Sequence, residues 1–268
     1  MAFIDYIHAV VLGIIEGATE FLPVSSTGHL ILAGELLHFE GEAATTFKIV
    51  IQLGAVLAVL LLYWRRYLGI ARNLVRLRLG EKNELNAVHM LLAMLPGLVV
   101  YLFAKDWIKE VLFSSETVVI GLIIGGVLLL VSSKARILVT SEDTDSITYK
   151  QALGIGLFQV LSLWPGFSRS GSILSGGMLL GVSQKAAADF AFIISVPVML
   201  GATVLDLYDS RALLTTDNLL LMGTGFLTAF LVAMLAVVTF LNLIKRLRLE
   251  WFAYYRFVLA AIFIFILI

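Results

Sequence analysis

The sequence contains no cysteine and few charged residues, and both absences narrow the kinds of protein it can encode. Without cysteine the chain forms no disulfide bonds and offers no thiolate ligands to a metal. Charged residues make up only 14% of the chain and the net charge is zero, so nothing indicates a nucleic-acid partner. Hydrophobic residues make up 60%, and the mean hydropathy is +1.00. A soluble domain is about half apolar and a quarter charged, so this composition predicts an integral membrane protein in a lipid bilayer.

Six apolar segments are candidates for helices that cross the membrane. A crossing helix needs about 20 mainly apolar residues. The stretch before the first candidate carries Asp5 instead of a basic region, and two glutamates interrupt it, so it is not typical of a cleavable signal peptide. We therefore predict an all-α integral membrane protein with six transmembrane helices, at Phe47 to Trp64, Ala87 to Ala104, Thr117 to Ser133, Ala186 to Leu205, Asn218 to Ile244 and Trp251 to Ile268.

Two polar motifs within this apolar chain resemble each other. Leu12 to Gly34 aligns without a gap with Ile155 to Gly177, at an offset of 143 residues. Segments rich in leucine and glycine also align by chance, which is the alternative explanation. The match favours an internal repeat whose two copies form one buried site. The alignment pairs Glu16 with Gln159, Ser25 with Ser168, Thr27 with Ser170 and Gly28 with Gly171.

The basic residues predict how the crossings are oriented. Loops rich in lysine and arginine face the cytoplasm by the positive-inside rule. The loops around 105–116 and 206–217 have no such excess, and we expect them outside. The basic loops hold Arg65, Arg66, Arg72, Arg76, Arg78 and Lys82, then Lys134 and Arg136, then Lys245, Arg246 and Arg248.

This orientation requires each polar motif to enter and leave the membrane on one side, as a re-entrant helical hairpin. We expect the hairpins at about 1–40 and 149–181. The chain is then a single membrane domain, 1–268, in which repeat one (1–140) and repeat two (141–268) have inverted topology. Irregular backbone at membrane depth persists only when protein or a wet cavity surrounds it, so the two hairpins should meet near the midplane.

Glu16 and Glu20 of the first motif are four residues apart and share one face of a helix that Pro23 should end. Each charge at the bilayer centre costs about 2.5–3.5 kcal/mol on insertion scales. Their mutual repulsion either keeps one carboxyl protonated or calls for a cation between them. The alternative is that both side chains extend to a nearby membrane surface.

The segment after Pro23 combines hydroxyl side chains with a histidine. Ser25, Ser26, Thr27 and Gly28 precede a new apolar run, which indicates the start of a helix. A helix N-terminus presents free amide donors and can hold an anion, although the hydroxyls could equally be ordinary helix caps. His29 follows directly and could serve in nucleophilic or general acid–base chemistry on a phosphoryl group.

The second motif repeats this layout and adds a guanidinium. Ser168, Ser170 and Gly171 surround Arg169, and uncharged sequence flanks the arginine on both sides. Arginine can bind a phosphate through two parallel hydrogen bonds. With no partner in its own segment, Arg169 should pair with Glu16, with Glu20 or with a bound anion.

The motifs Glu16-x-x-x-Glu20 with PVSSTGH, and PGFSRSG in the second half, resemble the signatures of the undecaprenyl-diphosphate phosphatase family, also called bacitracin resistance proteins. The likeness covers essentially the whole chain. It implies hydrolysis of undecaprenyl diphosphate to the monophosphate in the bacterial plasma membrane, which recycles the lipid carrier of cell-wall synthesis. It also implies a site open to the outer face and a requirement for a divalent cation. The family usually has threonine where this chain has Ile173, so that position carries no polar role here.

The resemblance and the residue chemistry together give a set of expected roles. Arg169 with Ser168, Ser170, Ser25, Thr27 and Gly171 binds phosphate, and Glu16 and Glu20 coordinate Mg²⁺ or Ca²⁺ and handle protons. Either Ser26 or His29 attacks the phosphorus. The acid phosphatase class of lipid phosphatases needs a further histidine after its Ser-Arg pair, and Ser170 to Gly181 contains none. The rival hypothesis is a secondary transporter or lipid flippase, because inverted repeats with broken helices are typical of transporters. The sequence leaves open whether the chain forms a homodimer.

Overall fold

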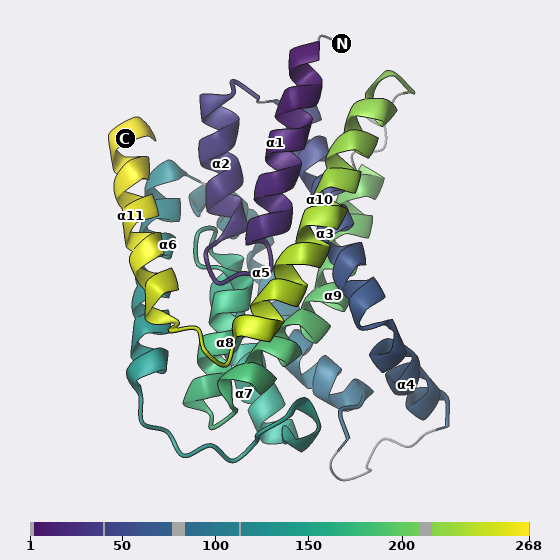
Figure 1. Cartoon of the computed structure of the whole chain (residues 1–268), viewed down its shortest axis with the longest axis vertical. Helices are drawn as coiled ribbons and strands as arrows, with labels where there is room; N and C mark the ends of the chain where they lie inside the picture. Colours follow the sequence, from purple (N-terminus) through teal and green to yellow (C-terminus); the bar gives the residue numbers. More distant parts are fainter. Residues whose placement is uncertain (1–2, 40, 77–83, 113, 210–215, 268) are drawn as a thin grey trace.

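A computed structural model describes residues 3–39, 41–76, 84–112, 114–209 and 216–267 of the chain. The described residues form helices joined by short connections, with one isolated parallel bridge between Ser141 and Val182 (Figure 1). The all-α class predicted from composition is therefore confirmed. The helices are α1 (Phe3–Thr19), α2 (Ser26–Leu36), α3 (Glu42–Leu62), α4 (Trp64–Val75), α5 (Ala87–Val111), α6 (Ser115–Lys134), η1 (Thr144–Ser146), α7 (Tyr149–Val160), η2 (Leu161–Leu163), α8 (Arg169–Leu179), α9 (Gln184–Asp209), α10 (Thr216–Leu243) and α11 (Glu250–Leu267).

Five helices in the described part of the chain are long and apolar enough to cross a bilayer. They coincide with the first five predicted crossings, so a multi-pass membrane protein is supported. The sixth predicted crossing coincides with the helix α11, although its last residue, Ile268, lies outside the described residues. The five spans are Ala44–Leu62, Ala87–Ile108, Ser115–Lys134, Gln184–Val204 and Leu219–Leu243.

The first basic loop contains a helix that the sequence did not predict. Helix α3 ends at Leu62, and after Tyr63 the chain continues as α4. Ile70 is the buried residue of α4, and three arginines with several exposed apolar side chains make up most of the rest of the helix. The segment is amphipathic because one apolar face packs on the protein, and an analysis based on long apolar runs does not detect such a helix. Arg78 and Lys82 of the same predicted loop lie outside the described residues.

Two pairs of short helices correspond to the predicted hairpins. Helices α2 and α8 have 11 residues each, which is about 16 Å of helix and too short to cross a bilayer core of about 30 Å. Figure 1 shows α1 and α2 in the upper half of the molecule, α7 and α8 in the lower half, and the connecting loops between them. Helix α1 packs mainly on α10, and α7 packs mainly on α5. Each hairpin is thus held by a long helix from the other half of the chain.

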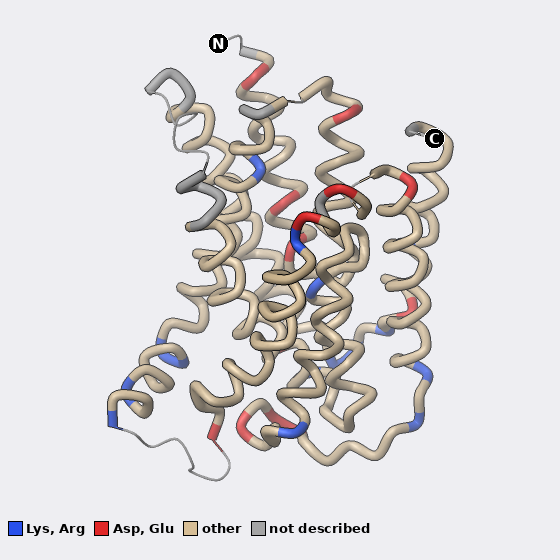
Figure 2. Tube along the Cα trace, turned by 180° about the vertical axis from the view of Figure 1, so that it is seen from behind, with Lys and Arg blue, Asp and Glu red and all other residues tan. Residues whose placement is uncertain are grey.

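Aromatic side chains pack on α9 in the core of the molecule. Phe190 and Phe192 of α9 are fully buried, and Phe192 packs edge-on against Phe21 and Phe240. The outer surface instead exposes many large apolar side chains, as a lipid-facing surface does. In Figure 2 most lysines and arginines lie toward the end of the molecule opposite the two termini.

Candidate active site

Glu20 is the first residue after the opening helix of the first hairpin. Helix α1 ends at Thr19, which is earlier than the predicted end at Pro23. The N–H of Glu20 still donates to the carbonyl oxygen of Glu16 at 2.9 Å, so the two carboxylates lie one helical turn apart, as their spacing predicts. Both carboxylates are buried in the protein. Phe21 fixes the chain after this turn, because it is buried and its ring centroid lies 5.6 Å from that of Phe192.

Ser25 and Ser168 begin the second helix of each hairpin with the same unusual backbone. Both have a φ of 70°, in the left-handed region that residues other than glycine seldom adopt. Each hydroxyl accepts a hydrogen bond from the N–H three residues later, at Gly28 (3.3 Å) and Gly171 (3.2 Å). The capping role that the sequence offered as an alternative is therefore present in both hairpins. Such backbone costs about 1–3 kcal/mol per residue and is concentrated at functional sites.

The two hairpins meet at Glu20. Arg169, the first residue of α8, donates from Nη2 to Oε1 of Glu20, and Ser26, the first residue of α2, donates from Oγ to Oε2. Ser170 extends the contact by donating to the carbonyl oxygen of Leu22 at 2.7 Å. Only 19% of the Arg169 side chain and 5% of the Glu20 side chain are exposed. Of the partners predicted for Arg169, the structure selects Glu20.

The remaining hydroxyls are divided between the site and its surroundings. Ser168 and Ser170 lie with their hydroxyl oxygens 3.1 Å apart, next to the first turn of α8. Thr27 is in the first turn of α2, but its side chain is exposed and makes none of the hydrogen bonds that join the hairpins. The structure therefore brings together Glu16, Glu20, Ser25, Ser26, Ser168, Arg169, Ser170 and Gly171, and it leaves Thr27 at their edge.

His29 has a separate pair of hydrogen bonds. Its Nδ1 lies 2.7 Å from the carbonyl oxygen of Ser25, which can only accept, so this nitrogen carries the proton. Its Nε2 lies 2.6 Å from the hydroxyl of Tyr255 in α11, which then donates to it. The two rings are stacked, with centroids 5.5 Å apart and planes 7° from parallel. In the described part of the chain, no hydrogen bond links His29 to Ser26 or Glu20.

The surroundings of Glu16 show whether the residues present fit the cation that the sequence predicts. It is 1% exposed, and its Oε1 has no hydrogen-bond partner among the described residues. No group of three His, Cys, Asp or Glu side chains in those residues is placed to hold a metal. Mg²⁺ is usually bound by one or two carboxylates together with water and substrate phosphates. The donor set of Glu16 and Glu20 fits a cation of that kind, shared with a bound phosphate.

Tyr255 and Arg256, adjacent residues of α11, are site components that the sequence analysis missed. Tyr255 bonds to His29, while Arg256 is fully buried beside the PGFSRSG segment. Arg256 donates from Nη2 to the carbonyl oxygens of Phe167 at 2.8 Å and Gly166 at 2.9 Å. A single arginine within the uncharged run from Trp251 to Ile268 was the available signal, and it is the same signal that identified Arg169.

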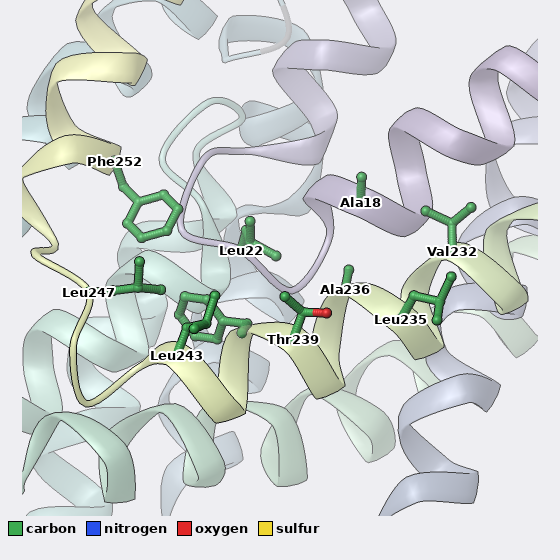
Figure 3. Close-up of a pocket in the computed structure, with 10 residues that line it drawn as sticks. Ala18, Leu22, Val232, Leu235, Ala236, Thr239, Leu243, Leu247 and Phe252 are labelled. Carbon is green, nitrogen blue, oxygen red and sulfur yellow. The ribbon is translucent and has the colours of Figure 1, made fainter.

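An apolar cavity lies beside the loop of the first hairpin. Its volume is about 410 Å³, and its walls come from the end of α1, from Leu22 and from the second half of α10, with Phe252 closing one side (Figure 3). Thr239 is the only hydroxyl among the lining residues. Because the Leu22 carbonyl accepts from Ser170, one wall of the cavity is also part of the junction between the hairpins.

Comparison with known proteins gives one consistent family. The model of the family "Bacitracin resistance protein BacA" matches residues 9–262. Undecaprenyl-diphosphatase 1 of Bacillus anthracis is 51% identical over 259 residues, which cover 97% of each chain. Undecaprenyl-diphosphatase 1 of Bacillus thuringiensis subsp. konkukian (strain 97-27) is 50% identical over the same length and the same shares. This chain therefore belongs to the bacitracin resistance protein BacA family.

Proposed function

We propose that this protein hydrolyses undecaprenyl diphosphate to undecaprenyl phosphate and inorganic phosphate, which recycles the lipid carrier of cell-wall synthesis and confers resistance to bacitracin. Relatives that are 50% and 51% identical over 97% of this chain are named undecaprenyl-diphosphatase. The structural observation that supports this most is the chain of contacts from Ser26 through Glu20 to Arg169. It joins a hydroxyl, a carboxylate and a guanidinium, which phosphoryl transfer needs and a carrier does not. Hydrolysis is therefore favoured over the transporter and flippase alternative.

The terminal phosphate of the substrate binds, in this proposal, at the first turn of α8. The pair with Glu20 uses one N–H of Nη2 of Arg169, which leaves the second N–H of Nη2 and a neighbouring guanidinium nitrogen for a two-point grip on the phosphate. The first backbone N–H groups of α8 add donors there, and the hydroxyls of Ser168 and Ser170 can add theirs by turning from Ser170 and from the Leu22 carbonyl to the phosphate. Ser25 and Thr27 supply the matching turn of α2. Donors that are fixed in advance stabilise the charge that develops as the phosphoryl group is transferred.

We assign the attack to Ser26, because its hydroxyl already donates to a carboxylate whereas His29 is bonded elsewhere. Ser26 Oγ forms a bond to the terminal phosphorus as Glu20 takes its proton, and the bond from phosphorus to the bridging oxygen breaks, releasing undecaprenyl phosphate. Water then attacks the phosphoserine and gives a proton to Nε2 of His29, where it replaces the hydrogen bond from Tyr255. The bond from phosphorus to Oγ breaks, Glu20 returns the proton to Ser26, and inorganic phosphate leaves.

A divalent cation, Mg²⁺ or Ca²⁺, completes the proposed site. Glu16 would hold it through the oxygen that has no partner in the described residues, together with Glu20. When bound, the cation neutralises charge on the phosphate oxygens. The residues of the chain retain the positioning and the proton transfers.

The isoprenoid chain of the substrate has a matching surface in the cavity beside Leu22. The cavity is apolar and adjoins the hairpin junction, so a lipid could lie in it while its phosphates reach Arg169. Replacing Ala236, a small lining residue, with tryptophan should fill this cavity. We expect a higher KM for a long prenyl diphosphate and little change for a short one. A similar change for both lengths, or for neither, would argue against this placement.

The topology we propose has six crossings and two re-entrant hairpins of opposite direction. Helices of 11 residues in both hairpins, and termini at the end away from most basic residues, support it (Figures 1 and 2). The basic end then faces the cytoplasm and the site opens to the outer face of the plasma membrane. Single cysteines at Arg72 and Glu110, tested with an impermeant thiol reagent in intact cells, check this: only position 110, just beyond the end of the Ala87–Ile108 span, should be labelled.

The decisive experiment for the function measures phosphate release from a prenyl diphosphate by the purified protein. The wild type should release inorganic phosphate when a divalent cation is present, and Ser26→Ala should lose about 10³-fold or more in rate because the nucleophile is gone. Ser133→Ala is the matched control, since the Ser133 hydroxyl donates only to the carbonyl of Leu130 in its own helix. A wild type that binds the diphosphate yet releases no phosphate with any divalent cation would support the transporter hypothesis instead.

A further inference from the structure

Arg256 is a cation inside the protein for which the structure provides no acidic partner. Its exposed fraction is 0%, and its Nη2 donates to three backbone carbonyls, those of Gly121 (3.2 Å), Gly166 and Phe167. Its Nε and Nη1 have no hydrogen-bond partner among the described residues. No carboxylate in the described part of the chain forms an ion pair with it. A buried charge without a counter-charge is costly, so its presence calls for an explanation.

Two glycines make the space for this guanidinium. A Cβ atom added to Gly125 of α6 would lie 2.2 Å from Nη2, and one added to Gly171 of α8 would lie 3.2 Å from Nη1. Arg256 is thus enclosed between α6 and the first turn of α8. Ser168 caps that turn, and it directly follows Gly166 and Phe167, whose carbonyls Arg256 binds.

The contacts of Arg256 determine the direction in which the loop presents its polar groups. The carbonyl oxygens of Gly166 and Phe167 both bind Arg256, so the orientation of these two peptide groups is set directly before the N–H donors that open α8. The next residue, Ser168, has the left-handed backbone that must be held in place by its surroundings. The hydrogen bonds from Arg256 to the two preceding carbonyls provide this support. The charge of Arg256 has no acidic partner in the described residues, and its Nη1, which makes no hydrogen bond there, lies beside Gly171 in the proposed anion site.

We propose that Arg256 is a positioning residue for the phosphate-binding turn of α8, and that the bound anion is the counter-charge that the protein itself omits. The proposal rests on the function proposed above for the same site. Arg256 supports the Gly166 to Ser168 backbone by binding the carbonyl oxygens of Gly166 and Phe167, and it does not contact the substrate. Its positive charge adds to that of Arg169 and of the helix N-terminus in a low-dielectric interior, where charges interact strongly.

The test compares Arg256→Lys and Arg256→Gln with the wild type by two readouts. The first is kcat and KM for prenyl diphosphate. The second is the rise in thermal unfolding temperature when inorganic pyrophosphate is added, which reports anion binding without turnover. Arg248→Lys and Arg248→Gln are the matched controls, because the Arg248 side chain is 73% exposed and lies just before the same helix.

We expect Arg256→Lys to lose about 10²-fold in kcat, because Nζ of lysine is one bond nearer the backbone than Nη2 and does not reach the three carbonyls, and a displacement of about 1 Å at a reacting group has an effect of that size. It should keep most of the pyrophosphate shift, since the charge remains. Arg256→Gln should lose both. If lysine and glutamine variants fail to fold, Gly125→Ala crowds both the native guanidinium and the Phe167 carbonyl that it binds, and should lower kcat in the same way.

Two results would overturn the proposal. One is a kcat and a pyrophosphate shift in folded Arg256→Lys and Arg256→Gln that match those of the Arg248 controls. The other is a lower unfolding temperature with unchanged turnover per folded molecule, which would make Arg256 a purely structural residue. A wild type without phosphatase activity would refute the proposed function, while the pyrophosphate shift would still test Arg256.

Discussion

The two hairpins have the same backbone design and opposite chemistry. Each starts its second helix with a serine at a φ of 70° whose hydroxyl caps the N–H of a glycine. At the next position, however, the first hairpin has Ser26 and the second has Arg169, which correspond under the offset of 143 residues. The two hairpins share the turn that presents this side chain, and they differ in the side chain presented.

Glu20 shows how the two presented groups are combined. It accepts from Ser26 with one carboxylate oxygen and from Arg169 with the other, so the two equivalent positions converge on one residue. The corresponding position of the second hairpin is Leu163, which offers no such group. The site is therefore asymmetric although its scaffold is duplicated. In the mechanism proposed above, one hairpin supplies the carboxylates and the attacking hydroxyl, and the other supplies the guanidinium that binds the phosphate.

Apart from loss of the proposed nucleophile Ser26, the largest effect should follow from changing the cation of the second hairpin while keeping its charge. Arg169→Lys removes the planar, two-point grip, so we expect phosphate release to fall by about 10²–10³-fold, the usual cost of losing a preorganised donor. The rate is measured with purified protein of matched folding, and Arg72→Lys on the exposed face of α4 is the control. Equal turnover in Arg169→Lys and the wild type would show that charge alone is sufficient there.

Much of the fold could be predicted because each long helix is a long apolar run. Helices α5, α6, α9 and α10 contain the predicted crossings with small differences at their ends. Helix α4 could not be found in this way, because its apolar face is short and its arginines dominate its composition. The pairing of α1 with α10 and of α7 with α5 was also out of reach, since single-sequence patterns do not state which apolar faces meet.

The sequence predicted several residues of the site, but not which of them bond to each other. A charge in an apolar run is visible in the sequence, and it identified Glu16, Glu20 and Arg169. The bond from Ser26 to Glu20 was not visible, because the two residues are six apart and face each other only after the chain reverses between α1 and α2. Tyr255 was missed for a similar reason, since it lies 226 residues from His29 and aromatic residues are common in apolar helices.

The second prediction uses the pair at positions 16 and 159, where the first hairpin has a carboxylate and the second has its neutral amide. Glu16→Gln should lower phosphate release by about 10–100-fold, the range for weakened metal ligation, and excess Mg²⁺ or Ca²⁺ should restore part of it by mass action. His29→Ala should not be rescued in this way. The assay is a titration of activity against free cation. A Glu16→Gln variant that responds to cation as the wild type does would remove Glu16 from the proposed cation site.

The third prediction compares the two caps. Ser25→Ala and Ser168→Ala should each destabilise the protein by about 0.5–2 kcal/mol, the usual cost of losing a helix N-cap. The loss should be larger for Ser168, because its hydroxyl also lies 3.1 Å from that of Ser170, whereas Ser25 Oγ has only the Gly28 contact. Unfolding in denaturant, in detergent solution, measures both. A greater loss for Ser25→Ala would mean that the first hairpin depends more on its cap than these contacts indicate.

The smallest effect concerns the way the second hairpin is anchored at its entrance. Asp145 in η1, just before α7, forms an ion pair with Arg66 of α4 and accepts from the N–H of Leu85 at 2.8 Å. Partial burial alone would raise the pKa of the Asp145 carboxyl, but the hydrogen bonds from Arg66 and Leu85 and the nearby charges bring it below its usual 3.8. A carboxyl whose pKa is lower in the folded state stabilises the fold above its unfolded pKa, and this contribution disappears as the pH falls through the folded value.

Asp145→Asn should therefore be less stable than the wild type at pH 7, by about 0.2–1 kcal/mol, since the pair is partly exposed. The difference should begin to shrink as the pH falls below about 3.8, the usual pKa that applies to the unfolded chain, and should disappear once the pH is below the lowered pKa of the folded state. Thermal unfolding at pH 7 and below pH 3.8 measures this, with Glu142→Gln on the exposed side of the same segment as control. A stability difference that stays constant over that range would mean that Asp145 anchors the second hairpin by its shape and hydrogen bonds rather than by its charge.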